Sequence, residues 1–293
     1  MNWRLTNDTP HGRIAPVFDR HPTLIPGRQH LSVLVGIVLL SIVLTQFIEL
    51  PTRPVGISVL GSPLGFELSS DWLMAALLAG LACTGTDAIV RTHPRAREVS
   101  LQHTFVYWVQ PGLVGLVAAR LLAQAPTRAI WAAGLVATGV LIVIVLIAEY
   151  TTVDRLAPSY SQARLLLNTL AYVLAFALFV IVYQSHGRSL ITATTTLVFS
   201  FALALDVLWG AGAEPGRTTA LAAAVGLVLG QCDWAMNYWQ ISAWSGGMLL
   251  LLVFYVMTGV ATQHLQGRLT RQVLIEFAIV AIGGMAVVVT LRP

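Results

Sequence analysis

Residues 190–210 read LITATTTLVFSFALALDVLWG, a run of apolar and hydroxyl-bearing residues that contains one carboxylate, Asp206. Its length matches the roughly 20 residues that an α-helix needs to cross a membrane. The other apolar segments of this kind lie at 31–50, 72–90, 105–124, 128–150, 163–184, 217–236, 241–264 and 271–290. Together they predict an all-α fold, a polytopic transmembrane helix bundle of about nine crossings, with eight or ten as the alternatives.

The composition supports a membrane location for the whole chain. Of its 293 residues, 56% are hydrophobic and 10% are charged, and the mean hydropathy is +0.76. Soluble domains carry roughly 25% charged residues. All 17 basic residues are arginine, so a mechanism that requires a lysine Schiff base is excluded. The net charge of +4 is spread along the chain and predicts no binding of nucleic acid.

The chain divides into a tail and one membrane domain. Residues 1–28 hold four prolines and four arginines without periodicity, which predicts an irregular basic cytoplasmic tail. Residues 29–293 form a single integral membrane domain. Most arginines fall on the cytoplasmic side if the N-terminus is cytoplasmic, which places the C-terminus outside. We expect the cytoplasmic (inner) membrane of a bacterium. Residues 51–70 predict a small extracytoplasmic hairpin around GSPLG.

Polar residues on seven of the predicted helices gather toward the cytoplasmic side of the membrane. Ionisable groups within a bilayer cost several kcal/mol on some scales and often mark functional sites. Asp206 and Glu276 lie deepest along their helices. The alternative is that several of these groups sit at helix ends in head-group water, paired with arginines. The candidate cluster consists of Asp87, Arg91, His103, Gln110, Glu149, Arg164, Asn168, Asp206, His264 and Glu276.

Gln110 stands beside Pro111 in the third segment, where a proline frees backbone carbonyls and transporters often build sites. A proline kink without any such role is the alternative. No cofactor and no metal is expected, because the chain lacks the H-E-x-x-H, C-x-x-C-H and Gly-rich phosphate motifs. Haem ligation by His103 and His264 is a weak alternative, since single histidines near helix ends are more often interfacial residues.

The seventh segment carries small residues every four positions, at Thr218, Ala222, Gly226 and Gly230. This spacing predicts close helix packing, either within the chain or against a second copy or a partner membrane subunit through 218–230. The same helix ends in Gln231, Asp233 and Asn237 near several tryptophans. Aromatic residues at the membrane surface need no ligand to explain them. The three polar residues are therefore candidates for a site on the outer face.

Three functions fit these features. The first is a carrier or permease for a small solute or a lipid, with the cytoplasmic-side cluster as its site. The second is a non-catalytic membrane subunit or scaffold, whose acids pair locally with arginines. The third, which we rank below the others, is an intramembrane enzyme acting on a lipid or polyprenyl substrate, because no reaction-specific spacing is present. Besides the subunit named above, the expected partners are membrane lipids.

Overall fold

The computed structural model describes residues 26–45, 53–59, 62–68, 70–93, 101–185, 189–239 and 241–290. Within these ranges the chain forms nine α-helices, one 3-10 helix and two strands. In chain order they are α1 (Arg28–Leu44), β1 (Arg53–Val59), β2 (Ser62–Leu68), α2 (Ser70–Val90), η1 (Leu101–Trp108), α3 (Val109–Ala123), α4 (Arg128–Thr152), α5 (Tyr160–Gln184), α6 (Ser189–Trp209), α7 (Pro215–Met236), α8 (Ala243–Leu265) and α9 (Arg271–Thr290).

Eight of the described helical segments are long and apolar enough to cross a membrane, and α1 is a shorter apolar helix. The predicted bundle of about nine crossings is therefore confirmed, and the protein is embedded in a membrane. The first crossing is shorter than the predicted 31–50, because α1 ends at Leu44 and residues 46–50 lie outside the described part of the chain. Most of the predicted tail, at 1–25, also lies outside it.

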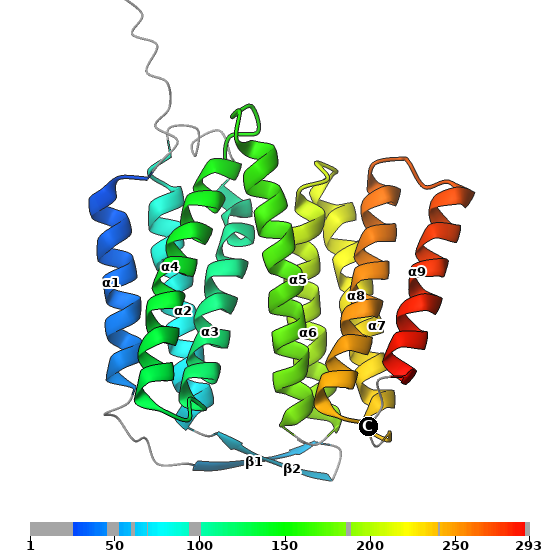
Figure 1. Cartoon of the computed structure of the whole chain (residues 1–293), viewed down its shortest axis with the longest axis horizontal. Coiled ribbons are helices and arrows are strands. Elements are labelled where there is room, and N and C mark those ends of the chain that lie inside the picture. Colours follow the sequence, from blue (N-terminus) through cyan, green and yellow to red (C-terminus); the bar gives the residue numbers. More distant parts are fainter. Residues whose placement is uncertain are drawn as a thin grey trace, which may run out of the picture.

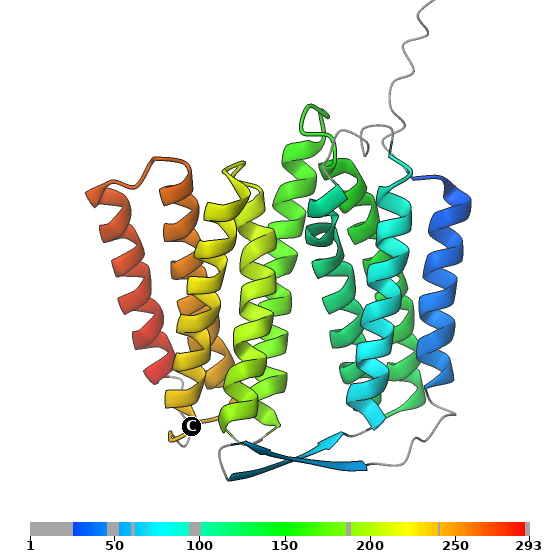
Figure 2. The ribbon, with the colours of Figure 1, turned by 180° about the vertical axis from the view of Figure 1, so that it is seen from behind.

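The helices run alternately up and down and form two groups that lie side by side (Figures 1 and 2). The first group is α1–α4 and the second is α5–α9. Contacts between the groups join α3 and α4 to α5, and α3 to α6. Most of the large buried side chains of both groups belong to one continuous apolar core. The two groups therefore form one domain with a seam between them.

The predicted hairpin is present as an antiparallel pair of strands at one end of the bundle (Figure 1). Val59 pairs with Ser62, and most of GSPLG therefore belongs to β2. The sequence placed the turn of the hairpin a few residues too late, because Gly and Pro in an edge strand resemble turn residues. We call this end of the bundle the hairpin end and the other the cluster end.

The third segment begins as a 3-10 helix and becomes α-helical at Val109. Pro111 is the third residue of α3, in its first turn, where a proline is tolerated because the first backbone N–H groups have no partner within the helix. The break that Pro111 predicts is therefore a change of helix type near the cluster end. It is not a kink in the middle of the membrane.

Thr127 begins α4 as its N-cap, as the sequence predicts. Its backbone is extended, and its hydroxyl oxygen accepts a hydrogen bond from the backbone N–H of Ile130 at 3.2 Å. Replacing Thr127 by alanine should cost about 1 kcal/mol of unfolding free energy, because this N–H loses its partner. Thr219→Ala, on the exposed face of α7, is the matched control and should change stability by less than about 0.5 kcal/mol. Equal losses in detergent unfolding would contradict the capping role.

Candidate functional site

Four polar side chains meet at the cluster end, on the seam between the two groups of helices. Gln110 lies in the first turn of α3, Glu149 in the last turn of α4, Arg164 near the start of α5 and Asp206 in the last turn of α6. Because consecutive helices are antiparallel, the start of α3 and α5 and the end of α4 and α6 fall at the same level. We call these four residues the charge cluster.

Asp206 is the centre of the charge cluster and is 0% exposed. Gln110 donates a hydrogen bond from Nε2 to its Oδ2 at 2.5 Å, and Arg164 forms a salt bridge from Nη1 to its Oδ1 at 3.3 Å. Both carboxyl oxygens thus have a partner, one from each group of helices. A buried carboxylate is stable when it is paired and hydrogen-bonded in this way.

Arg164 and Gln110 also bind backbone oxygens of the neighbouring helices. Nη2 of Arg164 donates to the backbone oxygens of Asp206 and of Val207, at the C-terminal end of α6. A cation is favourable there, because the last carbonyl groups of a helix carry partial negative charge. Gln110 donates from Nε2 to the backbone oxygen of Leu167 on α5 at 2.8 Å. Arg164 therefore ties α5 to α6, and Gln110 ties α3 to both.

Glu149 is the exception in the charge cluster, since it is 1% exposed and its Oε1 has no hydrogen-bond partner. It is close enough to interact electrostatically with both Asp206 and Arg164. One guanidinium therefore faces two carboxyl groups. The charge cluster is neutral only when one of the two carboxyl groups carries a proton, and a buried net charge is costly.

Asn168 lies one turn after Arg164 on α5, and its Oδ1 is buried without a hydrogen-bond partner. Asp87 and Arg91 pair with each other within one turn of α2 at 2.5 Å, and Trp108 donates from Nε1 to Asp87 at 3.2 Å. This pair is partly exposed and separate from the charge cluster. The expectation of local pairing at a helix end describes it better than the expectation of a shared site.

Two further residues expected in the cluster lie outside it. His264 is exposed at the end of α8, and Glu276 is exposed on α9. α9 contacts chiefly α8, so most of its surface, Glu276 included, faces away from the bundle. The side chain of His103 is not among those that the structure describes. The enzyme hypothesis expected two of Asp206, Glu276, His103 and His264 to lie within hydrogen-bond reach of each other. Glu276 and His264 are exposed and do not join Asp206.

An apolar cleft of about 500 Å³ lies between α3 and α4, where Leu174 of α5 borders it; it begins one turn from Gln110 and extends toward the hairpin end. Its walls come from α3, α4 and α5, and the connection from α3 to α4 borders it. Gln124 and Thr138 are its polar lining residues. The others are Val114, Val117, Ala118, Leu121, Leu122, Ala125, Pro126, Ile130, Gly134, Ala137, Leu141 and Leu174.

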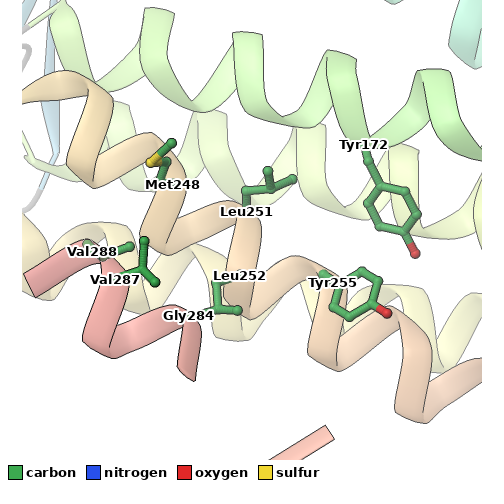
Figure 3. A pocket seen from close by; sticks show the side chains of 8 residues that line it. All are labelled: Tyr172, Met248, Leu251, Leu252, Tyr255, Gly284, Val287 and Val288. Atoms are coloured by element: carbon green, nitrogen blue, oxygen red, sulfur yellow. The ribbon is translucent and has the colours of Figure 1, made fainter. Parts of the chain in front are cut away.

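A second hollow of about 350 Å³ lies between α5, α8 and α9 (Figure 3). Tyr172 and Tyr255 stand at one end of it, with ring centroids 5.7 Å apart. Its walls are otherwise aliphatic or sulfur-bearing, and it is remote from the charge cluster. A lipid chain would fill such a groove without any polar recognition.

The small residues of α7 pack against α6 of the same chain. A Cβ atom added at Gly226 would lie 2.9 Å from the backbone oxygen of Leu197, and one added at Gly230 would lie 3.0 Å from that of Ala193. Ala222 on the same face is fully buried. A second chain has no access to this face while α6 covers it. Packing through another surface stays untested.

The outer-face candidates lie at the hairpin end of α7. Asp233 is 0% exposed, whereas Gln231 and Asn237 are exposed. Asn237 donates from Nδ2 to Oγ1 of Thr192 on α6 at 2.9 Å. The hydroxyl groups of Thr192 and Thr196, which lie near Asp233, were not among the residues predicted from the sequence. The four-residue spacing of Thr192, Thr196 and Ser200 was the signal that could have found them.

Comparison with curated proteins and with solved structures gave no match. A family model does match the chain, over residues 50–291. The matched residues begin before the hairpin and run through α2 to α9, so they include the whole charge cluster and Asp233. The chain belongs to the family described as "Protein of unknown function (DUF5656)".

Proposed function

We propose that this protein is a carrier for a small solute or a lipid, and that the charge cluster is its gate and proton site. The observation that carries this proposal is the buried hydrogen bond from Gln110 on α3 to Asp206 on α6, which crosses the seam and meets the salt bridge of Asp206 with Arg164 on α5. Polar contacts between two helix groups can break and form again when the groups rotate as rigid bodies.

The apolar cleft supports the same proposal. It lies between α3 and α4 next to α5, on the hairpin side of the charge cluster, and its lining is almost wholly apolar. A cargo that enters from that side would therefore meet the charge cluster as the next barrier. Apolar walls favour the lipid-like members of the proposed cargo class, because they bind hydrocarbon and offer few hydrogen bonds.

Glu149 supplies the proton coupling in this proposal. When the bridge between Arg164 and Asp206 is closed, the extra carboxyl group of Glu149 favours a bound proton, since the cluster is then neutral. Opening the seam would let water reach Glu149 and allow the proton to leave. Buried carboxylates in membrane proteins commonly act as proton relays in this way.

In orientation, we propose that the cluster end faces the cytoplasm of a bacterium, as the distribution of arginine predicts. The scaffold alternative expects no cavity and only local ion pairs. The cleft beside α5 and the hydrogen bond of Gln110 with Asp206 between the two groups favour the carrier.

The test is uptake by liposomes that contain the purified protein. A mixture of small solutes and lipids extracted from cells is added under an inward proton gradient, and the vesicle contents are identified by mass spectrometry. Wild-type protein should accumulate at least one compound. Asp206→Asn and Glu149→Gln should each reduce proton-driven uptake by about tenfold or more, the lower range for loss of one acid–base group.

Asp87→Asn is the matched control, because it removes a carboxylate from the same end of the bundle but from outside the charge cluster. It should transport at the wild-type rate. Equal uptake by wild type and Asp206→Asn would refute the gate, and the absence of any accumulated compound would count for the scaffold.

A further inference from the structure

Another buried carboxylate, Asp233, lies between α6 and α7, far along the bundle from the charge cluster. It is 0% exposed, and neither of its carboxyl oxygens makes a hydrogen bond of regular geometry. Asp206 differs in having a partner at each oxygen. A buried carboxylate without a positively charged partner costs several kcal/mol, so a ligand that supplies positive charge would be favoured there.

The surroundings of Asp233 are rich in oxygen atoms. Thr192 and Thr196 of α6 both interact with its carboxyl group. Oγ1 of Thr196 is buried and has no hydrogen-bond partner, and the same is true of Oγ of Ser200 one turn further along α6. Thr192 accepts its hydrogen bond from Asn237. Unpaired oxygen atoms thus lie on both helices.

The groups that face Asp233 from the other elements do not neutralise it. Tyr183 of α5 is near, but its hydroxyl group donates toward the backbone oxygens of Met236 and Trp239 at 3.1 Å and 3.0 Å. Cys232, the preceding residue on α7, is a thiol and brings no positive charge. Asp233 forms no salt bridge with any residue of the described ranges.

We propose that Asp233, Thr192 and Thr196 form a binding site for a sodium ion. Carboxylate and hydroxyl oxygens are hard ligands, and hard cations prefer them. A single carboxylate balances a single positive charge, whereas Ca²⁺ and Mg²⁺ would leave a net charge buried between the helices.

The closeness of α6 and α7 favours a small ion. Gly226 and Gly230 bring the two backbones together one to two turns from Asp233, where an added Cβ would lie within 3.0 Å of α6 atoms. Little room is left for K⁺. The site is reached from the hairpin end, because Asn237 is exposed and lies one turn beyond Asp233 at the end of α7.

The test is sodium binding at equilibrium, measured by calorimetry and by thermal unfolding of the purified full chain in sodium-free detergent buffer. NaCl should bind saturably and raise the unfolding temperature, because a ligand that binds the folded state stabilises it. KCl and choline chloride at equal concentration should not. Asp233→Asn should abolish the sodium effect.

Two threonine variants guard against a loss of folding in Asp233→Asn. Thr196→Val removes one proposed ligand at constant shape and should weaken sodium binding about tenfold, and Thr196→Ser should restore it. Thr194→Val, on the exposed face of α6, should bind sodium as wild type does. Asp206→Asn should also keep the sodium effect, so a failed gate and a failed sodium site are distinguishable.

Three outcomes would overturn the proposal. One is an equal response to NaCl and KCl in the wild type. Another is a sodium effect that survives in Asp233→Asn or is unchanged in Thr196→Val. The third is a dependence of stability on pH that Asp233→Asn removes while sodium has no effect, which would identify a proton site.

Discussion

Replacing Arg164 by methionine is expected to lower the free energy of unfolding by about 3–5 kcal/mol, the usual cost of removing one partner from a buried ion pair. Arg164 is the cation of the charge cluster, and its side chain is 11% exposed. Without it, Asp206 and Glu149 face each other as two buried carboxyl groups. The change should be measured by reversible unfolding in mixed detergent micelles.

The matched variants separate charge from packing. Arg164→Met combined with Asp206→Asn and Glu149→Gln removes all three ionisable groups, and it should recover most of the lost stability. Asp206→Asn alone should cost only about 1 kcal/mol, because Glu149 remains beside Arg164 as its counter-charge. If the triple variant were no more stable than Arg164→Met, the loss would come from packing and the electrostatic account would be wrong.

The second large effect is expected at Gly226, on the interface between α6 and α7. An alanine there would place its Cβ 2.9 Å from the backbone oxygen of Leu197 and 3.0 Å from Cβ of Phe201. Backbone atoms cannot move aside as a flexible side chain can. Gly226→Ala should therefore cost about 1–3 kcal/mol, the usual range for overpacking, and Gly226→Val should cost more.

Gly283→Ala is the matched control, because no heavy atom lies within 4 Å of an added Cβ at that position of α9. Alanine is a better helix former than glycine, so this variant should gain about 0.5–1 kcal/mol. Both variants are compared by unfolding in the same micelles. A Gly226→Ala protein as stable as Gly283→Ala would show that α6 and α7 are not closely packed.

The sequence predicts the helices well because each crossing needs a run of about 20 mostly apolar residues. Such a run can be recognised from neighbouring residues alone. The sequence also predicts four residues of the charge cluster, since Gln110, Glu149, Arg164 and Asp206 all lie near helix ends on one side of the bundle. Their convergence follows from alternating helix direction, which is known once the crossings are counted.

The remaining candidates required knowledge of how each helix is rotated. Glu276 and Asp206 look alike in sequence, but α9 packs chiefly on α8 and leaves Glu276 exposed, whereas α6 is enclosed by its neighbours. The oxygen atoms around Asp233 depend on the register between α6 and α7. That register is set by close contacts at Gly226 and Gly230, which sequence spacing suggests without fixing their partner.

In the proposed carrier, the two groups of helices move relative to each other when the charge cluster opens. This movement can be tested without knowing the cargo by measuring distances between spin labels with pulsed electron paramagnetic resonance. Cys83 and Cys232 are replaced by alanine, and labels are placed at exposed positions on opposite sides of the seam. One pair, Thr92 and Glu214, reports on the cluster end. The other pair, Arg128 and Tyr238, reports on the hairpin end.

If the two groups move in this way, we expect two distance populations for each pair of labels in lipid nanodiscs. Moving from mildly alkaline to mildly acidic buffer should shorten the distance between Thr92 and Glu214 and lengthen that between Arg128 and Tyr238, because a bound proton favours the closed charge cluster. Asp206→Asn should shift both pairs toward an open cluster end. A single distance for each pair that changes neither with pH nor in Asp206→Asn would contradict the account, because the seam would then be a fixed interface.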